Sequence, residues 1–128
     1  VPSSLPSLVK AYRIQDKARA VGFDWEEAQE VWTKVQEEIQ EVRQALETKD
    51  AEDVEGEFGD LLFAVVNAAR LYGVNPDNAL ERTNRKFISR FGYIESQAKA
   101  QGRDIKDLTL AEMDALWEKA KHLKHSQN

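Results

Sequence analysis

Apolar residues recur every three or four positions along most of the chain, and no stretch alternates strictly between apolar and polar residues. This period predicts helices rather than strands. A first helix is expected from Ser7 to a stop at Gly22. A second is expected from Trp25 or Glu26 to about Thr48, with Asp24 as its N-cap. Its apolar stripe comprises Val31, Val35, Ile39, Val42 and Leu46.

Three more helices follow from turn and capping signals. Asp50 is expected to cap a third helix, which carries the almost wholly apolar run from Leu61 to Val66 and should therefore be buried. Asn75 and Pro76 read as the N-cap and first residue of a fourth helix, ending near Gly102. A Thr-x-x-Glu capping box opens a short last helix, followed by a loose polar tail from Lys121. The expected inward residues of these last two helices are Leu80, Phe87, Phe91, Ile94, Ala98, Met113, Leu116, Trp117 and Ala120.

Length and composition fit one all-α domain. The chain has 128 residues, 41% hydrophobic and 32% charged, which excludes a disordered class. It contains no cysteine, which excludes disulfides and thiolate chemistry and is compatible with a cytoplasmic location. It has no apolar stretch near the roughly 20 residues that span a bilayer. The net charge of −5 argues against nucleic-acid binding but not against a small anion met by local cations.

An unusual set of acids lies on the second and third helices. Glu38 falls on the apolar stripe of its helix, with Glu41 on the flank, and Glu57 and Asp60 run directly into the apolar segment of the next helix. If the two helices pack antiparallel, these four carboxylates converge into an all-oxygen site suited to Mg²⁺ or Mn²⁺. The competing interpretation is two solvated helix faces rich in glutamate.

Other polar and aromatic residues are candidates for ligand binding only if such a metal site is present. Lys86 and Arg90 lie four apart on one flank of the fourth helix, with Asn84 on the other flank, and could offset the charge of phosphates bound to a metal. By composition alone, Trp117 is better explained as a core residue than as a stacking surface. His122 and His125 are expected to be solvated, and neither belongs to the ExxH pairs of di-iron proteins.

These residues resemble the MazG family of nucleoside triphosphate pyrophosphohydrolases. The matching motifs are EExxE at 37–41, ExxD at 57–60 inside GEFGDLLFAVVN, PSLVKAYRIQDKARAVGFDW at 6–25, ALERTNRKFISRF at 79–91 and LTLAEMDALW at 108–117. The resemblance implies a four-helix-bundle-like fold within an all-α superfamily that includes dimeric dUTPases. It further implies cleavage of NTPs or dNTPs between the α and β phosphates, giving NMP and pyrophosphate.

By the same resemblance, Glu38, Glu41, Glu57 and Asp60 hold Mg²⁺, and Lys86 and Arg90 hold phosphates. Asn84 is a weaker candidate for phosphate contact, and Trp117 would lie near the nucleotide. Our choice for the residue that orients the attacking water is Glu38, which is deepest on the apolar stripe.

The start of the chain resembles the C-terminal domain of two-domain family members, and the first residue is Val1 rather than Met. The chain is therefore interpreted as a processed protein or a piece of a longer one. The spacer between the two acidic motifs is only fifteen residues (42–56), which predicts loose base selectivity.

The regular apolar stripes predict a homodimer or higher homo-oligomer. Apart from a second copy of the chain, the expected partners are nucleoside triphosphates as substrates. Nucleic acids and membranes are not expected as partners. Two alternatives remain open at this point: a dUTPase-like or modified-nucleotide pyrophosphatase of the same superfamily, and a non-catalytic helical interaction module.

Overall fold

The computed structural model describes residues 1–48 and 50–124. These residues form five α-helices and two short 3₁₀ turns, which are joined by loops. The expectation of an all-α protein is confirmed, since no strand occurs in these ranges. In chain order the elements are α1 (Ser7–Ala20), η1 (Ala28–Glu30), α2 (Val31–Thr48), α3 (Ala51–Leu71), α4 (Pro76–Ala100), η2 (Ile105–Asp107) and α5 (Leu110–Lys124).

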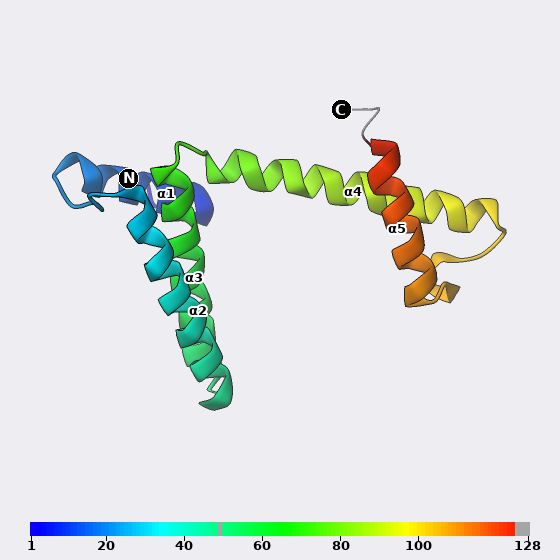
Figure 1. Ribbon diagram of the computed structural model, residues 1–128, viewed down its shortest axis with the longest axis horizontal. Coiled ribbons are helices and arrows are strands. Elements are labelled where there is room, and N and C mark those ends of the chain that lie inside the picture. Colours follow the sequence, from blue (N-terminus) through cyan, green and yellow to red (C-terminus); the bar gives the residue numbers. More distant parts are fainter. Residues whose placement is uncertain (49, 125–128) are drawn as a thin grey trace. The chain divides into compact units, whose positions relative to one another are not determined.

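The chain divides into two compact units, Val1–Ala79 and Leu80–Asn128, and each is described by itself. In the N-terminal unit, α2 and α3 lie side by side as an antiparallel hairpin, and α1 packs against α3 (Figure 1). We predicted one four-helix-bundle-like domain that includes helices of both units. This stays a prediction, because each unit is described by itself.

The buried face of α2 differs from the stripe of its largest apolar residues. The buried positions advance by four, three, four and three residues, the spacing by which one helix packs along another. They are Val31, Val35, Glu38, Val42 and Ala45. Ile39 and Leu46 were expected inside but are 38% and 50% exposed. Contact with α3 therefore buries the acidic side chain of Glu38 in preference to an adjacent isoleucine.

The apolar run of α3 is buried on one side only. Ala64 and Ala68 pack with Val31 and Val35 of α2 in one core cluster. On the other side, Leu62 is 62% exposed and Val65 48% exposed. The expectation that this helix is buried all round is therefore wrong for the described chain.

The second helix begins later than predicted. Residue 27 is extended (φ −122°, ψ 131°), and its N–H donates to Glu30 Oε1 at 2.9 Å, so the helical turn starts after Glu27. The single turn η1 then leads into α2 at Val31. Asp24 does not cap this helix, because its carboxylate accepts hydrogen bonds from Trp25 N and from Arg70 instead.

Most of the other helix boundaries follow the predicted signals. Asp50 caps α3 by accepting from Glu52 N at 3.0 Å, and Asn75 caps α4 by accepting from Asp77 N at 3.0 Å. Gly22 has φ +93°, a conformation that glycine adopts without strain. The turn at Gly22 returns the chain so that Phe23 N–H donates to the Ala18 carbonyl at 3.0 Å. The aromatic segment after α1 is thereby turned back along the helix end.

The C-terminal unit is organised around the contact between α4 and α5 (Figure 1). Its core joins Ile94 and Ala98 of α4 to Leu108 and Leu116. The earlier apolar positions of α4 were expected in this core but are exposed, Leu80 to 51%, Phe87 to 56% and Phe91 to 36%.

Within the described chain, the last helix is longer than expected. It continues to Lys124, where a loose tail from Lys121 was predicted. His122 lies on it and is exposed as expected, and the prediction for His125 falls outside the described residues. None of the described helices combines the length and the apolar character needed to cross a membrane.

The capping box of α5 gives a prediction on pH. Glu112 accepts hydrogen bonds from the Arg103 guanidinium and from Thr109 N at 2.9 Å, and these bonds lower the pKa of Glu112 from 4.5 to about 2. Because the folded pKa is depressed, the charged carboxylate stabilises the fold above about pH 4.5 and loses this effect as the pH falls towards 2. Glu112→Gln should therefore lower the melting temperature at pH 7, and the difference from wild type should shrink between pH 4.5 and pH 2.

Thermal unfolding followed by circular dichroism at a series of pH values measures this effect. Glu118→Gln is the matched control, because Glu118 is an exposed acid of the same helix with a single pairing to Lys121 at 3.5 Å. A difference for Glu112→Gln that persists unchanged at pH 2 would mean that charge is not its cause.

Candidate functional site

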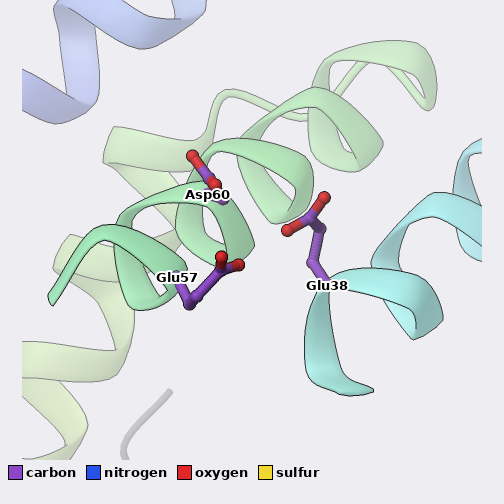
Figure 2. Close-up of side chains that lie close together, drawn as sticks. All are labelled: Glu38, Glu57 and Asp60. Carbon is purple, nitrogen blue, oxygen red and sulfur yellow. The ribbon is translucent and has the colours of Figure 1, made fainter. Parts of the chain in front are cut away.

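Three carboxylates gather between α2 and α3. One oxygen each from Glu38, Glu57 and Asp60 lies within 4.8 Å of the others. Figure 2 shows Glu38 reaching across from α2 towards the two acids of α3, which lie one turn apart on the same face. The antiparallel hairpin thus brings together acids that are separated in sequence by the α2–α3 turn.

Glu38 is the most enclosed of the three. The residue is 8% exposed, and its carboxylate is paired with Lys34 Nζ at 2.8 Å, one turn earlier on α2. This hydrogen bond raises the pKa of Lys34, whose side chain is 46% exposed. Sequence reasoning missed Lys34, although its i,i+4 spacing from Glu38 is a recognisable signal for an ion pair.

The charges in the cluster repel one another. The pKa of Glu57 is raised, first by desolvation and then by Glu41, Asp60 and Glu38. Carboxylate oxygens at this spacing are the donors that hard divalent cations such as Mg²⁺ and Mn²⁺ prefer, and a bound cation would offset the repulsion. The residues present therefore fit a divalent metal ion.

Glu41 lies beside this cluster but outside the group of three that meets at 4.8 Å. It is an exposed residue of α2, close enough to Glu57 to contribute to the raised pKa of that carboxyl. Its role as a fourth metal ligand stays a prediction.

A cleft of about 610 Å³ adjoins the acids within the N-terminal unit. Glu38, Asp60 and Lys34 line one part of it. Most of its remaining lining is aromatic, aliphatic or neutral polar, and includes Phe23, Trp25, Phe63, Gln15 and Asn67. The other two charged residues of the lining are Asp24 and Arg70. One cleft therefore combines an acidic part with an aromatic part, and sequence reasoning did not find it because its walls come from four separate segments.

The turn after α1 is held to α3 by an enclosed ion pair. Arg70 Nη2 donates to Asp24 Oδ1 at 2.6 Å, and the two side chains are 5% and 18% exposed. Hydrogen bonding from Arg70 lowers the pKa of Asp24. Arg70 also donates from Nε and Nη2 to Asn67 Oδ1 at 3.0 and 2.8 Å. These contacts fix the segment that carries Phe23 and Trp25 and so shape the cleft wall.

The predicted phosphate-binding residues lie in the C-terminal unit. The Arg90 guanidinium lies 5.4 Å from the centre of the Trp117 ring, and Arg90 Nε is buried without a hydrogen-bond partner. The ring centre of Phe87 lies 5.4 Å from that of Trp117 and 6.0 Å from that of Phe91. Trp117 is half-buried beside the α4–α5 core, as its composition-based interpretation expected.

Asn84 and Lys86 are exposed on α4. The structure therefore gathers Glu38, Glu57 and Asp60 in one unit, and Arg90 with Trp117 in the other. Whether the acids and the cations act on one ligand stays a prediction.

Comparison with known proteins finds similarity to the same family in both units. Residues 25–93 match the family model described as the MazG nucleotide pyrophosphohydrolase domain. The chain is 42% identical over 117 residues to "Nucleoside triphosphate pyrophosphohydrolase/pyrophosphatase MazG" of Thermotoga maritima, covering 91% of this chain and 45% of that protein. It is also 42% identical over 125 residues to the "Nucleoside triphosphate pyrophosphohydrolase" of Escherichia coli K12, covering 94% of this chain and 47% of that one.

A shorter similarity reaches "Uncharacterized protein YabN" of Bacillus subtilis, with 51% identity over 69 residues, 54% of this chain and 14% of that protein. The chain thus spans less than half the length of each of these relatives.

Proposed function

The chain belongs to the MazG nucleotide pyrophosphohydrolase family, and from this membership we propose that it is a divalent-cation-dependent hydrolase of nucleoside triphosphates. The observation that carries the proposal is the cluster of Glu38, Glu57 and Asp60, two of which line a cleft large enough for an organic ligand. The names of the relatives from Thermotoga maritima and Escherichia coli support the same reaction class.

The proposed reaction is hydrolysis between the α and β phosphates. A water oxygen forms a bond to the α-phosphorus, the bond from that phosphorus to the bridging oxygen breaks, and pyrophosphate leaves. The products are a nucleoside monophosphate and pyrophosphate, so one water is consumed for each triphosphate.

In this proposal Glu38, Glu57 and Asp60 hold Mg²⁺, with Glu41 as a fourth ligand. When bound, the ion supplies Lewis acidity and lowers the pKa of a coordinated water. Glu38 orients the attacking water, since its carboxylate is the most enclosed of the three and is held in place by Lys34 at 2.8 Å.

Cationic side chains offset the charge of the phosphates. Arg90 and Lys86 take this part, with Asn84 as an additional polar contact and Trp117 close to the nucleotide. The buried Arg90 Nε without a partner supports a ligand-binding role, because an unsatisfied buried donor is costly unless something binds to it. The half-exposed Lys34 ammonium lines the cleft beside the acids and is a further cation available to a phosphate.

We also propose a homodimer or higher oligomer. Phe58, Leu62 and Val65 of α3 are 45%, 62% and 48% exposed, an apolar surface that a second copy could cover. Light scattering that gave a monomer at micromolar concentration would contradict this part of the proposal.

Product identity tests the reaction. The protein is incubated with mixed NTPs and dNTPs, with Mg²⁺ or with EDTA, and the phosphates are resolved by chromatography. We expect NMP and pyrophosphate with Mg²⁺ and no turnover with EDTA.

Two results would overturn the proposal in different ways. NDP and orthophosphate would keep a phosphohydrolase but reject cleavage between the α and β phosphates. No turnover of any nucleotide would favour the non-catalytic interaction module.

A further inference from the structure

The aromatic part of the cleft contains a buried hydrogen-bond acceptor without a partner. Gln15 of α1 lines the cleft and is 5% exposed. Its Nε2 donates to the Phe63 carbonyl of α3 at 2.9 Å. Since a carbonyl can only accept, this contact fixes which end of the amide is nitrogen, and the atom left without a partner is the oxygen, Oε1.

An unsatisfied buried acceptor is uncommon and costs free energy, so it calls for a donor. Asn67 lines the same cleft, and in its amide group the oxygen is the atom that already has partners. Its Oδ1 accepts two hydrogen bonds from Arg70, which leaves the Nδ2 group as its available donor. The lining of the cleft thus includes one amide acceptor and one amide group that can donate, which are the kinds of group that bind the edge of a nucleobase.

The charge of this part of the cleft favours an uncharged ligand group. The one cation deep in the lining, Arg70, is neutralised by Asp24 at 2.6 Å. Trp25 and Phe63 supply flat apolar surface, 38% and 44% exposed, on which an aromatic ring can lie. The acidic part, with Glu38 and Asp60, belongs to the same cleft and would face the phosphate end of a nucleotide.

We propose that this cleft binds the nucleobase of the substrate, and that Gln15 Oε1 accepts a hydrogen bond from an N–H group on the base. Gln15 is then a specificity-determining residue, and the enzyme distinguishes bases more strongly than the short spacer between its acidic motifs suggests. The inference rests on the proposed nucleotide hydrolase function and adds the site of base recognition to it.

The test pairs each natural nucleotide with an analogue that lacks the donor. Suitable pairs are ATP with purine riboside triphosphate, CTP with the pyrimidin-2-one nucleotide, and UTP with N3-methyl-UTP. For whichever of these three nucleotides is the best substrate, the wild type should lose roughly tenfold in kcat/KM on the analogue, since a buried partner is left unpaired. Gln15→Leu should lose about as much on the natural substrate and show no further loss on the analogue.

Gln44→Leu is the matched control, because Gln44 is an exposed residue of α2 that lines no part of the cleft. Gln44→Leu should keep the wild-type kcat/KM on the natural substrate and should show the same roughly tenfold loss on the analogue as the wild type. If Gln15→Leu does not fold, Gln15→Met and the wild-type comparison of the two substrates still decide the question.

Equilibrium binding separates this inference from the proposed hydrolysis. Nucleotides with a methylene bridge between the α and β phosphates are titrated by calorimetry in Mg²⁺, with and without the base donor. The same tenfold pattern in Kd supports the base site even if no nucleotide is cleaved. An analogue penalty that is equal in wild type and Gln15→Leu, or no penalty in either, would overturn it.

Discussion

Glu38→Gln is expected to lower kcat for nucleoside triphosphate hydrolysis by at least about 100-fold at saturating Mg²⁺. The substitution keeps the size of the side chain but removes its charge, so the residue becomes a weaker metal ligand and a weaker hydrogen-bond acceptor for the attacking water. The fold should be retained, because the glutamine oxygen can still accept from Lys34, whose Nζ lies 2.8 Å from the carboxylate. Initial rates across a Mg²⁺ titration, with a thermal melt of each variant, measure both effects.

Glu37→Gln is the matched control, since Glu37 is the neighbouring acid on α2 and is exposed. Its rate should stay close to that of the wild type. Full activity of Glu38→Gln at saturating Mg²⁺ would remove Glu38 from the role of orienting water and leave it at most as one metal ligand among several.

Arg90→Met is expected to lower kcat/KM by about 100-fold without lowering the melting temperature. The rate should fall because the guanidinium no longer offsets phosphate charge. Stability should be kept because Arg90 Nε is buried without a partner, so that replacing the side chain with an apolar one of similar length breaks no hydrogen bond of that atom. Methionine can also retain contact with the Trp117 ring, which lies 5.4 Å from the guanidinium carbon.

Arg85→Met provides the comparison, because Arg85 is an exposed cation on the same helix, paired with Glu81 at 3.3 Å. It should change neither the rate nor the melting temperature. A parallel loss of activity and thermal stability in Arg90→Met would assign Arg90 to the packing of α4 on α5 rather than to phosphate binding.

The helices could be predicted because most of their ends depend on residues close in sequence. Asp50 and Asn75 accept hydrogen bonds from the backbone N–H groups two and three residues ahead. At the start of α5, the side chains of Thr109 and Glu112 each accept from the backbone N–H of the other. The exception is the start of α2. There the expected cap, Asp24, instead binds Arg70, a residue 46 positions away that no local pattern could single out.

The acids of the site were also visible in the sequence, but their surroundings were not. The position of Glu38 on a stripe of apolar residues indicated burial, and the structure confirms it. The same stripe misplaced Ile39 and Leu46, because the packing of α2 on α3 selects positions at a spacing of 3.5 residues and includes Ala45, whose small side chain gave little signal.

By itself, then, the sequence determined the helical class, most helix boundaries and the acids that meet between α2 and α3. The helical class and the helix boundaries depend on contacts within a turn of helix, and the acids could be singled out by their positions on the repeat of a single helix. The tertiary structure alone decided that Ala45 is buried on α2 while Ile39 and Leu46 are exposed, and it alone decided how the cleft is formed. The cleft requires the Gln15–Phe63 and Asp24–Arg70 contacts, which join residues 48 and 46 positions apart. Such contacts form only when α1 and its following turn pack against α3, and the periodicity of a single helix carries no information about them.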